Sequence, residues 1–117
     1  MSRHSDAVRL RDMLAHAREA IGLVRGRTRD DLKTTRLLQL GLVRLVEIIG
    51  EAAAHVSREG RLKCPAVPWD DVVGMRNKLI HGYASIDLDI LWDTVTDDLP
   101  RLTVELEKTI PPESEKR

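Results

Sequence analysis

One short stretch of the chain brings together side chains that could bind an anion and transfer a proton. Arg76 is followed directly by Asn77, and His81 and Tyr83 come shortly after them. On an ideal helix Arg76 points from near the middle of an apolar arc, where an unpaired guanidinium would be costly to bury. We therefore expect Arg76 to have an anionic partner or ligand. The residues of the arc are Val72, Val73, Met75, Leu79 and Ile80.

The geometry of a single helix leaves several interpretations of this cluster open. Arg76 and His81 lie about 140° apart on an ideal helix, so one unbroken helix cannot easily aim both at one phosphate. Either the helix unwinds toward Gly82, or a second copy of the chain completes the site. The structural alternative is a helix end at which Arg76 forms an intramolecular salt bridge and His81 caps the carboxyl terminus.

The same residues resemble the signature of the HepT-like branch of the HEPN superfamily, formerly a domain of unknown function. That signature is an arginine, four residues, a histidine, one residue and a tyrosine, which Arg76, His81 and Tyr83 match in this sequence. The resemblance extends over roughly residues 5–108. Beyond the motif, it is carried by residues 47–53, 68–77, 87–92 and 97–100.

The resemblance implies a metal-independent endoribonuclease that is the toxin of a type II/VII-like toxin–antitoxin pair. Arg76 and His81 would be catalytic and Asn77 supporting, with neither a cofactor nor a metal ion. The implied partners are RNA, a second copy of the chain whose motif faces the same cleft, and a minimal nucleotidyltransferase antitoxin. The alternative is a non-catalytic nucleotide- or substrate-binding partner subunit of a nucleotidyltransferase, because a fold does not fix a function.

The chemistry of the implied reaction suits these residue types. RNA supplies its own 2′-hydroxyl nucleophile, so cleavage requires proton transfer and charge stabilisation. A histidine can act as general acid or base near neutral pH, and a guanidinium can hold a phosphate through two parallel hydrogen bonds. Tyr83 has two interpretations: a packing residue after the helix end, or the tyrosine that the antitoxin adenylylates. Adenylylation would add negative charge and bulk where RNA must enter.

Helical spacing of apolar residues predicts an all-α fold, an antiparallel four-helix bundle with a kinked final helix. The second and longest helix should run to about Arg58, and Pro100 should kink or interrupt the fourth. The expected helices cover about residues 5–26, 30–58 and 69–81, and a fourth segment from residue 85 or 87 onward. The expected caps are Ser5 or Asp6, Asp30 or Asp31, and Ser85 or Asp87.

Composition sets the remaining expectations. The 117 residues contain no Phe, one Tyr and two Trp, so we expect an aliphatic core. The length fits a single domain, residues 1–110, followed by a disordered tail, residues 111–117. Basic residues dominate the first third and acidic residues the last, which allows either a basic surface for an anion or complementarity between helices. Cys64 is the only cysteine, and no apolar run approaches membrane-spanning length, so we expect a cytoplasmic protein without disulfides.

Two acidic groups offer a metal-dependent alternative that we consider weaker. Glu47, Glu51 and His55 recur every four residues, as metal ligands on one helix could. Neighbouring arginines extend the same stripe, which is more simply the polar face of the second helix. The aspartates of the fourth helix fit capping and solvation better than a two-metal nuclease.

Overall fold

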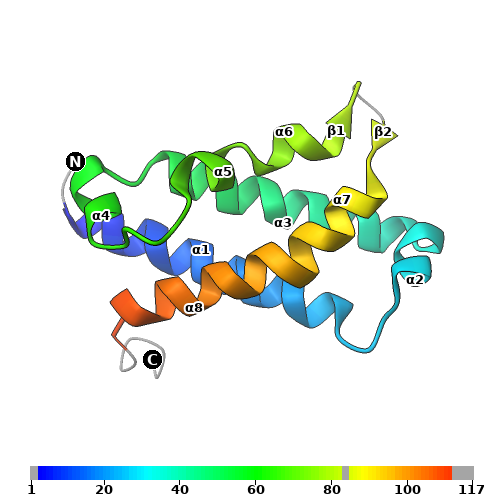
Figure 1. Cartoon of the computed structure of the whole chain (residues 1–117), viewed down its shortest axis with the longest axis horizontal. Helices are drawn as coiled ribbons and strands as arrows, with labels where there is room; N and C mark the ends of the chain where they lie inside the picture. Colours follow the sequence, from blue (N-terminus) through cyan, green and yellow to red (C-terminus); the bar gives the residue numbers. More distant parts are fainter. Residues whose placement is uncertain (1–2, 83–84, 112–117) are drawn as a thin grey trace.

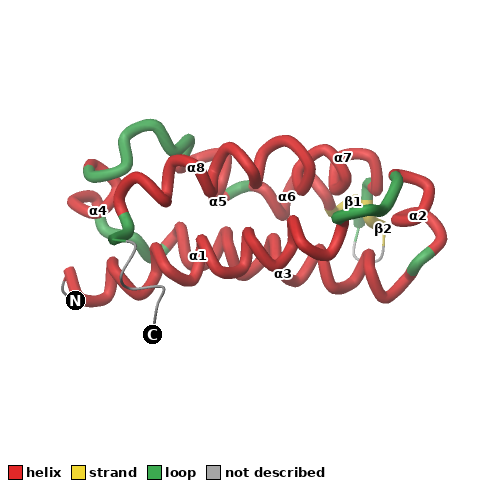
Figure 2. The backbone as a smooth tube through the Cα atoms, turned by 90° about the horizontal axis from the view of Figure 1, so that it is seen from below, coloured by secondary structure: helices red, strands yellow, loops and turns green. Residues whose placement is uncertain are grey.

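The computed structural model describes residues 3–82 and 85–111 of the chain, with side chains from Asp6 onward. Most of the described backbone is helical, which confirms the predicted all-α class. Helices α1 (Arg3–Val24) and α3 (Arg36–Ala54) lie side by side and form one layer (Figure 1). The second layer contains α5 (Trp69–Val73), α6 (Met75–Leu79), α7 (Leu88–Asp93) and α8 (Leu99–Thr109), as Figure 2 shows.

The predicted second helix is wrong in its bounds, because it is divided into two helices and ends four residues early. A short α2 (Arg29–Thr34) is separated from α3 by Thr35, whose backbone is extended. The break is stabilised by Gln39, whose side-chain amide donates to the carbonyl oxygens of Leu32 at 2.9 Å and Lys33 at 3.3 Å. At the other end, α3 stops at Ala54 and α4 (Arg58–Leu62) follows. The connecting turn after α1 uses a left-handed Gly26, as the predicted helix end requires.

Two expected N-caps have different roles in the structure. The first helix begins at Arg3, so Asp6 lies inside it, and its carboxylate accepts hydrogen bonds from the backbone and the hydroxyl of Ser57. These bonds hold the pKa of Asp6 below its usual value and tie α1 to the start of α4. The cap of α2 is Thr28, and Asp31 completes a reciprocal capping box from the third helical position.

The predicted helix over residues 69–81 is also wrong. It is divided at Gly74 into α5 and α6, and it ends at Leu79. The next two residues form strand β1 (Ile80–His81), which pairs antiparallel with β2 (Ser85–Ile86). The carbonyl oxygen of Leu79 then accepts a hydrogen bond from the backbone of Asp87 at 2.7 Å, a bond that replaces a further helical turn. Of the interpretations left open above, the helix does unwind before Gly82.

The final helix agrees with its prediction. Asp87 caps α7 through a hydrogen bond from the backbone of Ile90 at 3.0 Å. The helix passes through a π-helical turn, η1 (Thr94–Asp98), immediately before α8, where Pro100 occupies the first turn. Since proline cannot donate a helical hydrogen bond and crowds the preceding turn, the change of helix type is the predicted interruption.

A close approach between α3 and α5 fixes the position of the candidate site. A Cβ atom added at Gly50 would lie 3.3 Å from the carbonyl oxygens of both Val72 and Val73. Only glycine therefore allows the two helices to come so near without displacement. The core beneath them is aliphatic, as predicted, and its most deeply buried side chains include Met13, Leu32, Leu42, Ile49, Leu79, Leu91, Leu99 and Leu106.

We expect Gly50→Ala and Gly41→Ala to differ in stability although both lie in α3. Gly41 has no atom within 4 Å of an added Cβ, so alanine there should raise the free energy of unfolding by about 0.5–1 kcal/mol. At Gly50 the same gain in helix propensity is offset by contact with backbone oxygens, and the net change should be zero or destabilising. Urea denaturation of both variants measures the difference. An equal stabilisation at the two positions would contradict the close approach.

Three further expectations concern a membrane span, the C-terminal tail and the homodimer. No described helix is both long and apolar enough to cross a membrane. The predicted tail falls almost entirely on residues 112–117, which lie outside the described residues, and its separation from a domain ending at residue 110 stays a prediction. The homodimer also stays a prediction.

Candidate functional site

Arg76 has the anionic partner that its sequence environment predicts. Its Nε donates to Oε2 of Glu47 on α3 at 2.6 Å, and Oε1 of the same carboxylate accepts from Arg44 at 3.3 Å. The guanidinium side chain is 50% exposed, whereas Glu47 is 26% exposed. The break at Gly74 explains why Arg76 is not buried in the apolar arc: the arc belongs to a continuous helix that does not form.

Arg76 and Asn77 lie in a groove of about 370 Å³ between α3 and the α5–α6 segment. Gly50, where the backbones of α3 and α5 approach closely, is one of the residues that line the groove. Its walls carry two arginines and two glutamates, so the site is polar but has no excess of positive charge. The complete lining consists of Arg44, Glu47, Gly50, Glu51, Ala54, Val73, Arg76 and Asn77.

His81 lies outside this groove, at the start of the β1–β2 hairpin. Its Nε2 is 3.5 Å from Oδ2 of Asp87, and the imidazole side chain is 64% exposed. The hydrogen bond from the backbone of Ile90 is the main cause that holds the pKa of Asp87 below its usual value, and His81 lowers it further. A carboxylate that also caps α7 is thus kept ionised beside the imidazole.

Within a single chain the two expected catalytic residues contact different elements. Arg76 is held by α3 and His81 faces the cap of α7, and the described side chains of these two residues share no hydrogen bond or ion pair. Tyr83 lies outside the described residues, so its expected role stays a prediction. The turn that leads to it contains Gly82 with φ 68°.

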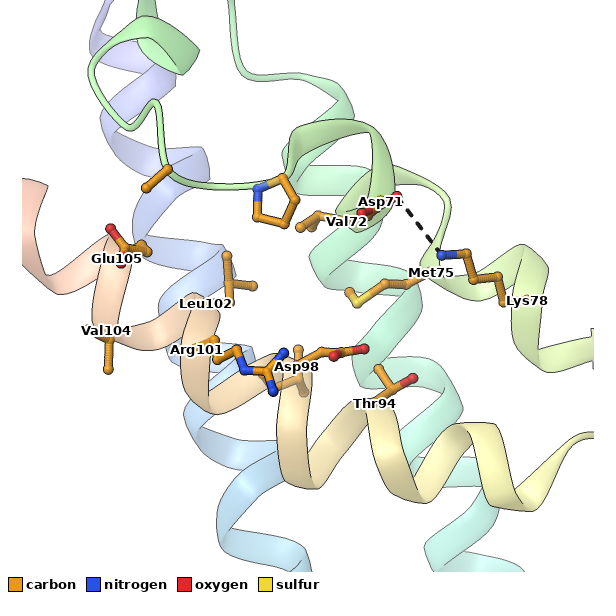
Figure 3. A pocket seen from close by; sticks show the side chains of 13 residues that line it. Asp71, Val72, Met75, Lys78, Thr94, Asp98, Arg101, Leu102, Val104 and Glu105 are labelled. Carbon is orange, nitrogen blue, oxygen red and sulfur yellow. Dashed lines mark ion pairs between the residues drawn. The ribbon is translucent and has the colours of Figure 1, made fainter.

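A second and larger hollow, of about 630 Å³, lies between α5–α6 and the η1–α8 segment. Figure 3 shows Met75 and Lys78 of α6 on one side and Asp98, Arg101 and Leu102 on the other. None of the expected site residues Arg76, Asn77 and His81 lines it, although Val72 and Met75 of the predicted apolar arc do. The short helix α6 therefore separates this hollow from the groove that holds Arg76.

The acidic residues considered above as metal ligands have other contacts. Glu47 binds two arginines, and the ring of His55 is hydrogen-bonded to the carbonyl oxygen of Glu51 rather than to its carboxylate. Across residues 6–82 and 85–111, no three His, Cys, Asp or Glu side chains are gathered as a metal site would require.

Comparison with known proteins decides the family. The family model described as ribonuclease HepT-like matches residues 13–109, a range that contains the groove, the hairpin and the cap of α7. The chain belongs to the HepT-like ribonuclease family. The resemblance read from Arg76, His81 and Tyr83 is thereby confirmed at the level of the family.

Two relatives agree with this assignment over most of their length, and a third over less than half of its own. A protein of Methanocaldococcus jannaschii, provisionally named an RNase, is 35% identical over 92% of this chain and 98% of its own. A probable ribonuclease HepT of Thermococcus cleftensis is 36% identical over 84% and 93%. A further protein of M. jannaschii, named both a gamma-glutamylcyclotransferase and a provisional RNase, is 37% identical over 81% of this chain but only 45% of its own. No solved structure matches the chain.

Sequence reasoning missed how this HepT-like chain holds Arg76. Glu47 is 29 residues away in sequence, and the helical pattern placed it on a solvated polar face. One signal was present: Glu47 and Gly50 lie one turn apart within a segment that resembles the family. Together they provide the carboxylate that binds Arg76 and the close approach that brings α6 within reach.

Proposed function

We propose that the protein is a metal-independent endoribonuclease toxin of a toxin–antitoxin pair. Arg76 and His81 are its catalytic residues, Asn77 supports them, and RNA is the substrate. Its antitoxin is a cognate minimal nucleotidyltransferase, with Tyr83 as the candidate for adenylylation. In this proposal the helices form the antiparallel four-helix bundle of a HEPN fold, and two copies share one cleft.

The observation that carries this proposal is a complete motif, in a HepT-like chain, whose two reactive side chains are both accessible. Arg76 is half exposed, and His81 is mostly exposed, so a phosphodiester can reach each of them. Asn77 lies beside Arg76 in the same groove. A structural helix end would account for the salt bridge of Arg76, but it would not require both side chains to be accessible.

The proposed reaction needs two proton transfers. The 2′-oxygen attacks the adjacent phosphorus and loses its proton to a base, while the bond to the 5′-oxygen breaks and that oxygen gains a proton. The products are a 2′,3′-cyclic phosphate and a 5′-hydroxyl. Arg76 neutralises the charge that develops on the phosphoryl oxygens. One chain offers one motif histidine, whereas two copies offer a base and an acid, which supports the dimer.

Cleavage in the presence of a chelator tests this function. Purified wild-type protein is expected to cut total cellular RNA in excess EDTA, because neither Arg76 nor His81 needs a metal ion for its role. Fragment ends are then analysed for cyclic phosphates, and a mock preparation controls for contaminating nucleases. Activity that disappears with EDTA would contradict a metal-independent mechanism. A well-folded, unmodified dimer that cuts no RNA would favour the non-catalytic binding subunit instead.

A further inference from the structure

The carboxylate of Glu47 restricts the orientation of the Arg76 guanidinium. It accepts from Nε at 2.6 Å, within the range of a strong charge-assisted hydrogen bond. Among residues 6–82 and 85–111, no side chain or carbonyl accepts from either terminal amino group of Arg76. The edge of the guanidinium that suits a phosphate, its two terminal nitrogens, is thus left available while the Nε edge is occupied.

Glu47 is itself well fixed. Its second oxygen accepts from Arg44, and its side chain is largely shielded on α3. One turn further along the helix, the close contact at Gly50 sets the distance between α3 and the segment that carries Arg76. A carboxylate held at both oxygens, at a fixed spacing from the arginine, is suited to orienting that arginine.

We propose that Glu47 is a positioning residue for Arg76. It holds the guanidinium by Nε so that both terminal amino groups face the scissile phosphate. This inference rests on the proposed ribonuclease function. The opposite role is a latch that competes with phosphate for Arg76, and the two roles differ in sign: removing a positioning residue slows the chemical step, whereas removing a latch accelerates it.

The experiment compares Glu47→Ala, Glu47→Gln and Glu107→Gln in steady-state cleavage of a short RNA. Glu107 is the matched control, because it forms an exposed ion pair with Arg18 of another helix at 2.7 Å. Neither residue lines the groove. We expect Glu47→Ala to lower kcat about 10-fold or more, because Arg76 loses its orientation. KM should not rise, since the variant also loses a negative charge near the phosphate. Glu47→Gln keeps an acceptor for Nε and should recover part of kcat. Glu107→Gln should match the wild type.

The NMR signal of the Arg76 Nε–H group provides a readout that does not depend on activity. It should be protected from exchange in the wild type and in Glu47→Gln, and lose that protection in Glu47→Ala. Glu47→Ala with unchanged or higher kcat would overturn the positioning role and favour the latch. If the wild type cuts no RNA, the proposed function fails. If the Arg76 Nε–H group is equally protected from exchange in the wild type and in Glu47→Ala, the orientation of Arg76 by Glu47 is overturned, whether or not the protein cleaves RNA.

Discussion

Replacing His81 by alanine should reduce kcat/KM for RNA cleavage by about 10²–10⁴-fold, because the variant loses a general acid or base. The imidazole is mostly exposed and its contact is a single carboxylate at 3.5 Å, so the fold should tolerate the change. Arg76→Ala should cost about 10²–10³-fold through lost stabilisation of the phosphoryl charge. Arg76→Lys should recover little, because an ammonium cannot bind Glu47 and present two parallel donors to a phosphate.

Two controls make this result specific to the site. His55→Ala removes another exposed histidine, whose ring is hydrogen-bonded to the carbonyl oxygen of Glu51, and should leave cleavage unchanged. Thermal unfolding should give similar Tm values for His81→Ala and the wild type. Induced expression should arrest growth with the wild type and not with either site variant. Full cleavage by both His81→Ala and Arg76→Ala would remove these residues from the mechanism.

The features that were predictable from the sequence are those set by local rules. Helical periodicity gives the all-α class, and the local chemistry of Asp87 and Pro100 gives the cap of α7 and the interruption before α8. The family follows from a short motif, whose spacing can be read without a structure.

The features that could not be predicted depend on contacts between distant segments. A helical wheel over residues 69–81 assumes a continuous helix, but Gly74 and the pairing of Ile80 with Ile86 divide that stretch. Asp6 looks like a local cap, yet its carboxylate binds Ser57, 51 residues away. The partner of Arg76 is equally remote. No periodicity encodes such pairs, because each depends on how close two backbones come, as at Gly50.

The second prediction with a large expected effect concerns the proposed homodimer. A stripe of outward residues runs along α3 with alternating spacings of three and four, as in a helix that pairs with another. It begins at Leu37, whose 82% exposure is unusual for a leucine, and it passes the Arg76-binding carboxylate of Glu47. The members of this α3 stripe are Leu37, Leu40, Arg44, Glu47, Glu51 and Ala54.

When two copies pair antiparallel, four of the six residues of the α3 stripe meet complementary partners. With the two-fold axis between Arg44 and Glu47, each Arg44 lies opposite the partner's Glu47, and each Leu37 lies opposite the partner's Ala54. Opposite charges then meet at the centre and apolar residues at both ends, while each Leu40 lies opposite the partner's Glu51. Because Arg76 binds Glu47, the pairing would place both copies of Arg76 near the axis, as a shared cleft requires.

Leu37→Glu should therefore weaken dimerisation, raising the dissociation constant about 100-fold if each copy loses about 1.5 kcal/mol of apolar burial. Leu62→Glu is the matched control, since Leu62 is 70% exposed on α4, outside the stripe. Analytical ultracentrifugation over a concentration series measures the effect. If the cleft is shared, cleavage by Leu37→Glu should fall with the dimer and return as protein concentration rises. If the Leu37→Glu protein is monomeric and still cleaves RNA at the wild-type rate, the whole site lies within one chain. If the wild type is monomeric at micromolar concentration, this interface is excluded.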